Sequence, residues 1–399
     1  MTIPMQRPFL GPEELQAVER VFESRWLGLG AFTQAFEREL QTFLGVRHAI
    51  AVSSGTAALH IGLDILDLQP GDEVLVPTLT FVATAQAVMM TGATPVFCDV
   101  DAKTFNLDVN DAARRITGRT KAIIPVHYGG TACDMEAVGR LAAEAHLKIV
   151  EDAAHAFGST YQGQKIGTRS DVTCFSFDPV KNITCGEGGA VVTDDRDLAD
   201  KAASRRVLGI TKDAWSRLAT VQPWSYDVDG PGFRYHMSNL NAAIGLEQMK
   251  RFEAFRQRRQ AIARRYDEAF AGVPGLLLRE QHLPETCPFL YAVRVVDGRR
   301  DALMDHLKQG GIMTGVHYIP NHLHRAFAHL RTSLPTAERL VQEILTLPLF
   351  YEMTDEQVEL VIAAVRRFFP TATRVVAVVP RDRSAAATRP PARAVSESL

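Results

Sequence analysis

Three groups of residues in the first half of the chain have types and spacings suited to chemistry. The first is the run Ser53-Ser54-Gly55-Thr56, which follows an apolar segment and opens a helical pattern. The free backbone N–H groups and the positive dipole end of a helix start favour an anion such as a phosphate. The alternative is an ordinary serine cap. No Gly-Lys-Ser/Thr follows this run, and residues 186–189 precede a strand, so neither nucleotide-binding fingerprint is present.

The second and third groups are a carboxylate and an amine. Residues 148–155 read as a strand that ends in Glu151 and Asp152, where a carboxylate is costly unless a cation pairs with it. A metal, a protonated heterocycle and the solvated cap of a following helix are the alternatives for Asp152. Lys181 comes 181 − 152 = 29 residues later, in a loop before a glycine-rich turn. A lysine that is partly desolvated beside another cation is a nucleophile towards carbonyls, although most loop lysines are simply solvated.

A single cofactor explains all three groups. Pyridoxal phosphate needs a phosphate cradle, an acid for its pyridinium nitrogen and an amine for its aldehyde. Residues 53–56, Asp152 and Lys181 offer these partners within one segment. The sequence therefore predicts a site for pyridoxal phosphate, with pyridoxamine phosphate as its second form.

An α/β sheet must bring these residues together. Short apolar runs, typical of strands, lie at 49–52, 73–77, 94–99, 121–126, 148–151, 172–177 and 190–193. Helical patterns lie between them at 57–66, 82–90, 134–145 and from 198 onward. This alternation predicts the α/β class: a three-layer α/β/α large domain with a mainly parallel seven-stranded sheet, whose ligands bind at the carboxyl ends of the strands.

The rest of the chain predicts a second, smaller unit. A helical run at 239–268 leads out of the large domain, and segments 290–296, 300–309, 338–345 and 355–368 follow it. We expect a large domain over residues 1–250 and a small C-terminal α+β domain over 251–370. Residues 371–399 are dominated by Ala, Arg, Pro, Ser and Val, so we expect a disordered tail there.

Composition excludes several classes of protein. The 399 residues are 46% hydrophobic and 23% charged, which is typical of globular chains. Their net charge of −2 gives no positive field for nucleic acid, and no apolar run reaches membrane-spanning length. Five widely spaced cysteines without a Cys-x-x-Cys pair fit neither a disulfide framework nor a zinc ribbon. We expect a soluble cytoplasmic protein with no bound metal and no nucleic-acid or membrane partner.

Five segments carry a resemblance to a known family. They are SSGTAALH (53–60), VPTLTFVATAQAV (76–88), VEDAAHAFGSTYQGQKIGTRSDVTCFSF (150–177), VKNITCGEGGAVVT (180–193) and FRYHMSNLNAAIGLEQ (233–248). They resemble the DegT/StrS family of nucleotide-sugar aminotransferases, which are pyridoxal phosphate enzymes with the aspartate-aminotransferase type of fold. The likeness runs from about residue 9 to 369, and the runs EDAAHA and KNITC are most similar to those of sugar 4-aminotransferases.

The resemblance implies roles for particular residues around the cofactor. Lys181 would hold the aldehyde as a Schiff base and move the proton during transamination, and Asp152 would pair with the pyridinium nitrogen. The remaining cofactor-binding residues that it implies are Gly55, Thr56 and Ser176 at the phosphate, Phe81 stacked on the ring, and His155 near the ring hydroxyl. His155 stands where many members have Gln.

The resemblance also implies a homodimer with shared active sites. Family members commonly lend an Asn, from a Gly-aromatic-x-aromatic loop, to the cofactor phosphate of the neighbouring subunit. Here the loop reads Gly232-Phe-Arg-Tyr-His236, so Arg234 or His236 would take that role.

Two further segments have alternative interpretations. His317, His322 and His324 lie within eight positions, but Pro320 interrupts the run, which makes a zinc site less favourable than a place at the active-site mouth. The resemblance puts His317 and Tyr318 near the sugar or nucleotide. Trp26 either stacks on the nucleotide base or is a core or dimer residue.

These observations predict an aminotransferase that transfers an amino group, with glutamate as the donor, to a nucleotide-linked 4-keto-6-deoxy sugar. Such a product would serve a surface polysaccharide or a glycosylated metabolite. The alternatives are amination at C3, amination of a cyclitol ketone, and a regulator that binds the cofactor without turnover. The complete set of Lys181, Asp152 and phosphate cradle favours an enzyme over a regulator.

Overall fold

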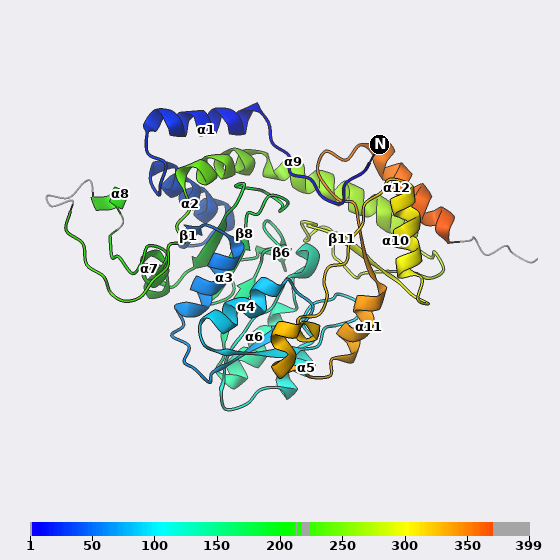
Figure 1. Ribbon diagram of the computed structural model, residues 1–399, viewed down its shortest axis with the longest axis horizontal. Coiled ribbons are helices and arrows are strands. Elements are labelled where there is room, and N and C mark those ends of the chain that lie inside the picture. Colours follow the sequence, from blue (N-terminus) through cyan, green and yellow to red (C-terminus); the bar gives the residue numbers. More distant parts are fainter. Residues whose placement is uncertain (1, 213, 218–223, 370–399) are drawn as a thin grey trace, which may run out of the picture.

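The computed structural model describes residues 2–212, 214–217 and 224–369. Within these ranges the chain forms a large central sheet with helices on both faces and a smaller antiparallel sheet (Figure 1). The predicted tail, residues 371–399, lies outside the described residues.

A seven-stranded sheet forms the core of the larger part. Its strands are β1 (His48–Val52), β2 (Glu73–Pro77), β3 (Thr94–Cys98), β4 (Thr120–Ile123), β5 (Lys148–Asp152), β8 (Val172–Ser176) and β9 (Gly189–Thr193). They are ordered β1-β9-β8-β5-β4-β2-β3, and β9 alone runs antiparallel to its neighbours in this sheet. The predicted mainly parallel seven-stranded sheet is confirmed, with every strand close to its expected position.

Helices cover both faces of this sheet, which confirms the predicted three layers. One layer holds α3 (Gly55–Asp64), α4 (Val82–Met90) and α7 (Arg196–Arg205); the other holds α2 (Ala31–Leu44), α5 (Val109–Arg114), α6 (Met135–Ala145) and the first half of α9 (Asn239–Phe270). Alternate residues of β1 face the two layers, with Ile50 and Val52 towards α3 and Ala49 and Ala51 towards α2. Because both faces are buried, the strands read as continuous apolar runs.

A second, antiparallel sheet lies in the C-terminal part of the chain. It has the order β10 (Leu276–Leu278), β11 (Tyr291–Val295) and β12 (Ile344–Leu347), and α10 (Arg300–Gln309) and α12 (Asp355–Phe368) pack against it. The segment 338–345, expected as one element, contains the end of α11 (Pro335–Glu343) and the start of β12. The predicted smaller α+β part is confirmed.

Helix α9 connects the two parts (Figure 1). Its first half, with Ala242 and Phe252, belongs to the core under the large sheet, whereas Ile262 and Tyr266 in its second half belong to the core of the small sheet. The expected domain boundary at residue 250 falls inside this continuous helix and stays a prediction.

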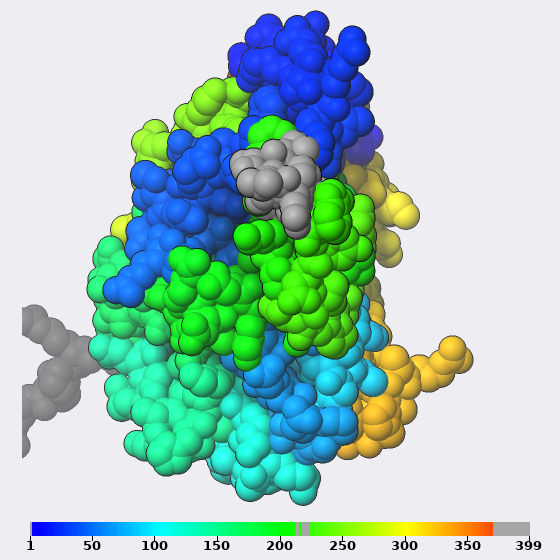
Figure 2. Space-filling model, turned by 90° about the vertical axis from the view of Figure 1, so that its left-hand side faces the viewer, coloured from blue at the N-terminus to red at the C-terminus, as the bar shows by residue number. Residues whose placement is uncertain are grey.

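The remaining elements are short or peripheral. They are α1 (Pro12–Ser24), η1 (Tyr128–Gly130), β6 (Thr160–Tyr161), β7 (Gln164–Lys165), α8 (Ala214–Arg217), η2 (Asn321–Leu323) and η3 (Arg325–Leu330). Figure 2 shows the described residues of the connection from α7 to α9 (green) at the surface beneath the N-terminal residues (blue). No helix in the described ranges is long and apolar enough to cross a membrane.

Helix α3 packs so closely on β8 that Gly62 has no room for a side chain. A Cβ atom there would lie 2.8 Å from Cys174 Sγ and 3.1 Å from Val172 Cγ1. We expect Gly62→Ala to lower the free energy of unfolding by about 1–3 kcal/mol relative to Gly139→Ala, the usual cost of overpacking. Gly139 is the matched control, because it lies in α6 with nothing within 4 Å of its Cβ position. Urea unfolding of both variants measures the difference, and equal stabilities would contradict the expectation.

Candidate active site

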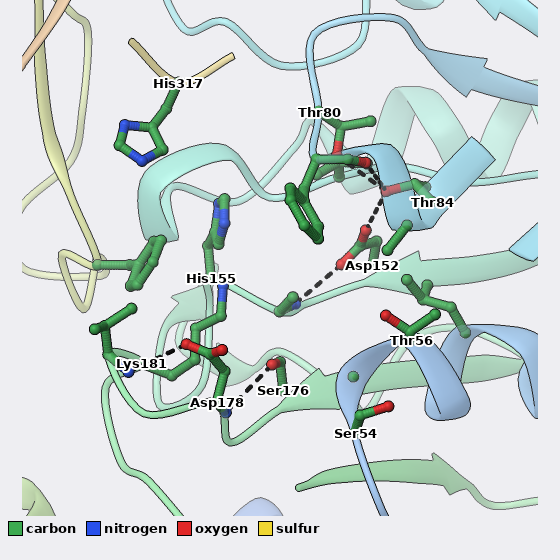
Figure 3. A pocket seen from close by; sticks show the side chains of 18 of the residues that line it. Ser54, Thr56, Thr80, Thr84, Asp152, His155, Ser176, Asp178, Lys181 and His317 are labelled. Atoms are coloured by element: carbon green, nitrogen blue, oxygen red, sulfur yellow. Dashed lines mark hydrogen bonds between the residues drawn. The ribbon is translucent and has the colours of Figure 1, made fainter. Parts of the chain in front are cut away.

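A cavity opens at the carboxyl ends of the central strands, where parallel sheets bind ligands (Figure 3). Asp152 comes from the end of β5 and Ser176 from the end of β8, and the start of α3 completes the floor. Nine of the predicted site residues line this cavity: Gly55, Thr56, Phe81, Asp152, His155, Ser176, Lys181, His317 and Tyr318.

Asp152 presents a buried carboxylate to the cavity. Its side chain is 4% exposed, and it accepts hydrogen bonds from Thr84 Oγ1 (2.7 Å) and from the Ala154 amide (3.1 Å). Burial raises the pKa of Asp152, and the Thr84 and Ala154 bonds and the charge of Lys181 offset only part of this effect. No Lys, Arg or His of the described chain lies within ion-pair distance of this carboxylate. The site therefore suits a ligand that brings its own protonated nitrogen.

Glu151, the neighbour of Asp152, points to the other face of β5. The Cys133 amide donates to His127 Nδ1 (3.0 Å), so the ring proton lies on Nε2, which donates to Glu151 Oε2 over 2.6 Å. Burial raises the pKa of Glu151, but the interactions with His127, Ser170 and Thr173 together outweigh burial, so the pKa of Glu151 is lowered. Glu151 therefore has a structural role, and Asp152 is the carboxylate that faces the cavity.

Lys181 brings an amine to the same cavity. It ends a tight turn after β8, and its Nζ lies 4.2 Å from the centre of the Phe289 ring. Burial lowers the pKa of Lys181 from 10.5 to about 8, against the opposing charges of Asp178 and Asp152. Near pH 7.4 about a fifth of an amine with such a pKa is neutral, roughly two hundred times the share of an ordinary lysine, and the neutral form is the nucleophile towards an aldehyde.

The start of α3 forms an anion cradle against the end of β8. Ser54 caps this helix by accepting from the Ala57 amide (3.1 Å), so the cap interpretation is correct for Ser54. The amides of Gly55 and Thr56 have no protein acceptor within the described part of the chain and remain available to an anion. A Cβ atom at Gly55 would lie 2.6 Å from Ser176 Cβ, so glycine is needed for this close approach.

His155 and Tyr318 form a directed hydrogen-bond chain along one wall. The Gly129 amide donates to His155 Nδ1 (3.4 Å), which assigns the ring proton to Nε2, 3.0 Å from the Tyr318 hydroxyl. His155 also stacks on Phe289, with ring centres 4.3 Å apart. Burial and nearby positive charge keep the pKa of His155 well below its usual value, so the imidazole is neutral. Tyr318 thus accepts from His155 and keeps its own proton for a ligand.

The three histidines of residues 317–324 do not converge. His317 bonds to Thr346 Oγ1 (3.0 Å), whereas His322 is buried and bonds to Thr78 Oγ1 (2.7 Å). Within the described ranges, no group of three or more His, Cys, Asp or Glu side chains is arranged to hold a metal. All five cysteines are buried free thiols.

Three predicted site residues lie outside the cavity lining. Trp26 donates from Nε1 to the Leu29 carbonyl (2.8 Å) and contacts the Trp215 ring. Arg234 and His236 lie on the connection to α9 and form isolated bridges with Val207 and Val52. Their expected contacts with a nucleotide or a neighbouring subunit stay predictions.

Several functional positions carried no usable sequence signal. Thr84 lies within a helical pattern and is not distinguished there by its residue type. It comes three residues after Phe81 and therefore lies on the same side of α4 as Phe81. Phe289 lies more than a hundred residues from Lys181 in the sequence, so only folding brings the two together. Asp178 appears in the sequence as part of a turn and emerges in the structure as a cavity carboxylate.

The sequence is similar to that of a known family of enzymes. The sequence pattern of the DegT/DnrJ/EryC1/StrS aminotransferase family matches residues 8–366. The chain belongs to this family. It is 41% identical over 374 residues to the spore coat polysaccharide biosynthesis protein SpsC of Bacillus subtilis, covering 91% of this chain and 96% of SpsC.

Solved structures agree with this assignment. The sugar aminotransferase CalS13 from Micromonospora echinospora has a TM-score of 0.84 at 31% identity, covering 92% of this chain and 99% of CalS13. Spr1654 from Streptococcus pneumoniae, solved in a PMP form, has a TM-score of 0.87 at 32% identity, covering 92% and 98% of the two chains. The chain is therefore a pyridoxal phosphate-dependent aminotransferase of the sugar aminotransferase family, with the expected aminotransferase fold.

The residues of the cavity fit pyridoxal phosphate independently of the similarity to known proteins. Among the described residues, the buried Asp152 carboxylate has no cationic partner and the Gly55 and Thr56 amides have no acceptor, and the Lys181 amine has a lowered pKa. A pyridinium nitrogen, a phosphate and an aldehyde are the three groups that meet these needs.

The lowered pKa of Lys181 gives a measurable pH dependence. In the apoprotein we expect reductive methylation of Lys181 by formaldehyde and cyanoborohydride to be half-maximal near pH 8, because the amine loses its proton there. The rate should fall below that pH and level off above it. Mass spectrometry of the peptide that contains Lys181 measures the profile. A midpoint near 10.5, the ordinary pKa of a lysine, would contradict the effect of burial.

Proposed function

We propose that this protein transfers an amino group from glutamate to a nucleotide-linked 4-keto-6-deoxy sugar. The observation that carries the proposal is the convergence of Lys181, Asp152 and the α3 anion cradle in one cavity. The similarity to SpsC, a polysaccharide biosynthesis protein, supports a sugar acceptor for a surface polysaccharide. Amination at C3 and amination of a cyclitol ketone are the alternatives.

Each predicted residue has a part in this proposal. When bound, pyridoxal phosphate supplies an aldehyde for amines and a ring that accepts electrons. Asp152 would keep a proton on the ring nitrogen, and Gly55, Thr56 and Ser176 would hold the phosphate. Phe81, exposed beside the cavity, would stack on the ring.

Lys181 and the wall of the cavity handle the reacting groups. Lys181 would hold the aldehyde, and its Nζ, once an amino donor has replaced it, would accept and return the proton of the donor carbon. His155 would lie near the ring hydroxyl. Tyr318 offers its proton to an acceptor oxygen, and His317 lies with it at the sugar side.

We further infer that the active protein is a cytoplasmic homodimer. Arg234 is exposed and lines no part of its own cavity, which suits a residue that reaches the cofactor phosphate of a neighbouring subunit. His236 is the second candidate for this contact. Trp26, in the same part of the surface as Trp215, is the candidate for the nucleotide base.

Colour tests the role of Lys181 directly. We expect the purified protein with pyridoxal phosphate to be yellow, and borohydride to remove the colour and fix the cofactor on Lys181. Lys181→Ala should lose this fixed adduct, and its amino-transfer rate should fall by about 10²–10⁴, since it lacks the proton-transferring amine. Absorbance and peptide mass spectrometry give both readouts. A wild-type protein that binds no pyridoxal phosphate would contradict the proposal.

Product analysis tests the acceptor. With glutamate as donor and a panel of nucleotide-linked 4-keto and 3-keto sugars and a cyclitol ketone, we expect amine product from the 4-keto-6-deoxy sugar. Chromatography with mass detection identifies the product, and the Lys181→Ala protein is the control. Product from the 3-keto sugar or the cyclitol ketone alone would establish the corresponding alternative.

A further inference from the structure

Gln6 lines the cavity and has no role in the transfer chemistry of Lys181. Its Nε2 donates to the Phe289 carbonyl over 3.3 Å, which fixes the orientation of the side-chain amide. The second N–H and the Oε1 atom of this amide have no partner in the part of the chain that the structure describes. Gln6 therefore has one donor and one acceptor left for a ligand.

The segment before Gln6 is held by the small C-terminal part of the chain. The Ile3 amide donates to the Gly311 carbonyl (2.8 Å), and the Leu349 amide donates to the Met5 carbonyl (3.0 Å). These backbone bonds place residue 6 at the cavity and do not involve its side chain. A change of the Gln6 side chain should therefore leave the path of the backbone as it is.

Gln6 lies on the side of the cavity where Lys181 ends. Phe289, whose carbonyl accepts from Gln6, also has its ring centre 4.2 Å from Lys181 Nζ. One residue therefore contacts both the reacting amine and the free amide. A substrate whose reacting carbon lies at Nζ would present an adjacent position to Gln6.

The same side of the cavity holds His317. Met5, which precedes Gln6, and His317 both pack around Gly315, since a Cβ atom there would lie 2.7 Å from Met5 Sδ and 3.2 Å from His317 Cε1. In the proposed function His317 belongs to the sugar side of the site. Gln6 is thus placed on the sugar side as well.

The free donor and acceptor of Gln6 match a hydroxyl group better than a carboxylate. A hydroxyl accepts from the N–H and donates to Oε1, so both atoms of the amide are paired. A carboxylate only accepts, and would bring a second unprotonated oxygen close to Oε1. A sugar hydroxyl therefore fits Gln6 better than a carboxylate of the amino donor does.

We propose that Gln6 is a specificity-determining residue that binds the C3 hydroxyl of the acceptor sugar. The inference rests on the proposed function, in which C4 of a 4-keto-6-deoxy sugar reacts beside Lys181. The two ring neighbours of C4 are C3, which carries a hydroxyl, and C5, which carries a methyl group. Of these two, C3 alone offers a group that both donates to and accepts from an amide.

The test combines a change in the protein with a matching change in the substrate. Gln6→Met keeps the length of the side chain and removes its amide, and the 3-deoxy analogue of the nucleotide-linked 4-keto-6-deoxy sugar lacks the hydroxyl. We expect the kcat/KM of the wild type to be about tenfold lower for the analogue than for the parent sugar, the usual effect of losing one or two neutral hydrogen bonds. Gln6→Met should show a similar loss with the parent sugar and no further loss with the analogue.

Two controls isolate the contact with the sugar. Arg7→Met makes the same replacement at the next residue, whose side chain is 60% exposed and pairs with Glu352 (3.3 Å), and should keep the wild-type preference for the parent sugar. The half-reaction with glutamate alone involves no sugar, so its rate, measured by absorbance, should be equal in Gln6→Met and the wild type. Circular dichroism and thermal unfolding confirm that each variant is folded.

The outcomes separate this inference from the proposed function. An equal loss on the 3-deoxy analogue in Gln6→Met and the wild type overturns the inference, because the hydroxyl is then bound elsewhere. A slower glutamate half-reaction in Gln6→Met also overturns it. If the wild type binds no pyridoxal phosphate or aminates no 4-keto sugar, the proposed function fails and the inference fails with it. If the wild type aminates the 4-keto sugar without the coupling to Gln6, only the inference fails.

Discussion

The burial of one carboxylate, Asp152, is the constraint on which the site depends. A buried charge without a partner is costly, and two hydrogen bonds, from Thr84 and the Ala154 amide, offset only part of that cost. The carboxylate lies at the end of β5, a central strand whose last three residues are buried. The remaining stabilisation must come from a cationic ligand, which is the physical basis for selecting a protonated ring nitrogen.

The walls of the cavity are tied together around this carboxylate. Asn321 donates from Nδ2 to the carbonyls of Thr78 (3.1 Å) and Thr80 (2.9 Å), so the segment after Tyr318 is attached to the loop that carries Phe81. Phe81 and Tyr318 therefore act as one unit, with ring centres 5.9 Å apart. The helical and loop segments on two sides of the cavity come from parts of the chain more than two hundred residues apart, which gives the small C-terminal part a direct share in shaping the site.

Local patterns in the sequence predicted the elements of the large sheet well. Each strand of the seven-stranded sheet was a short apolar run because this sheet is covered on both faces, and the helices between the strands had clear amphipathic or apolar patterns. The segment 338–345 was read less accurately because a helix passes into β12 there without a glycine or proline to mark the change. Helix α9 shows the same limit at a larger scale, since nothing in its sequence marks where it leaves one core and enters the other.

The sequence by itself predicted which groups would meet in one site: the Lys181 amine, the Asp152 carboxylate and the glycine at position 55 follow from residue type and from their places after strands, and all three line one cavity. Only the tertiary structure decided how these groups behave. Burial lowers the pKa of Lys181 against the charges of Asp178 and Asp152, and the direction of the hydrogen bond to Tyr318 depends on the amide of Gly129. Such effects require atoms from distant segments to lie within a few ångströms of each other, and a linear pattern of residues carries no record of those distances.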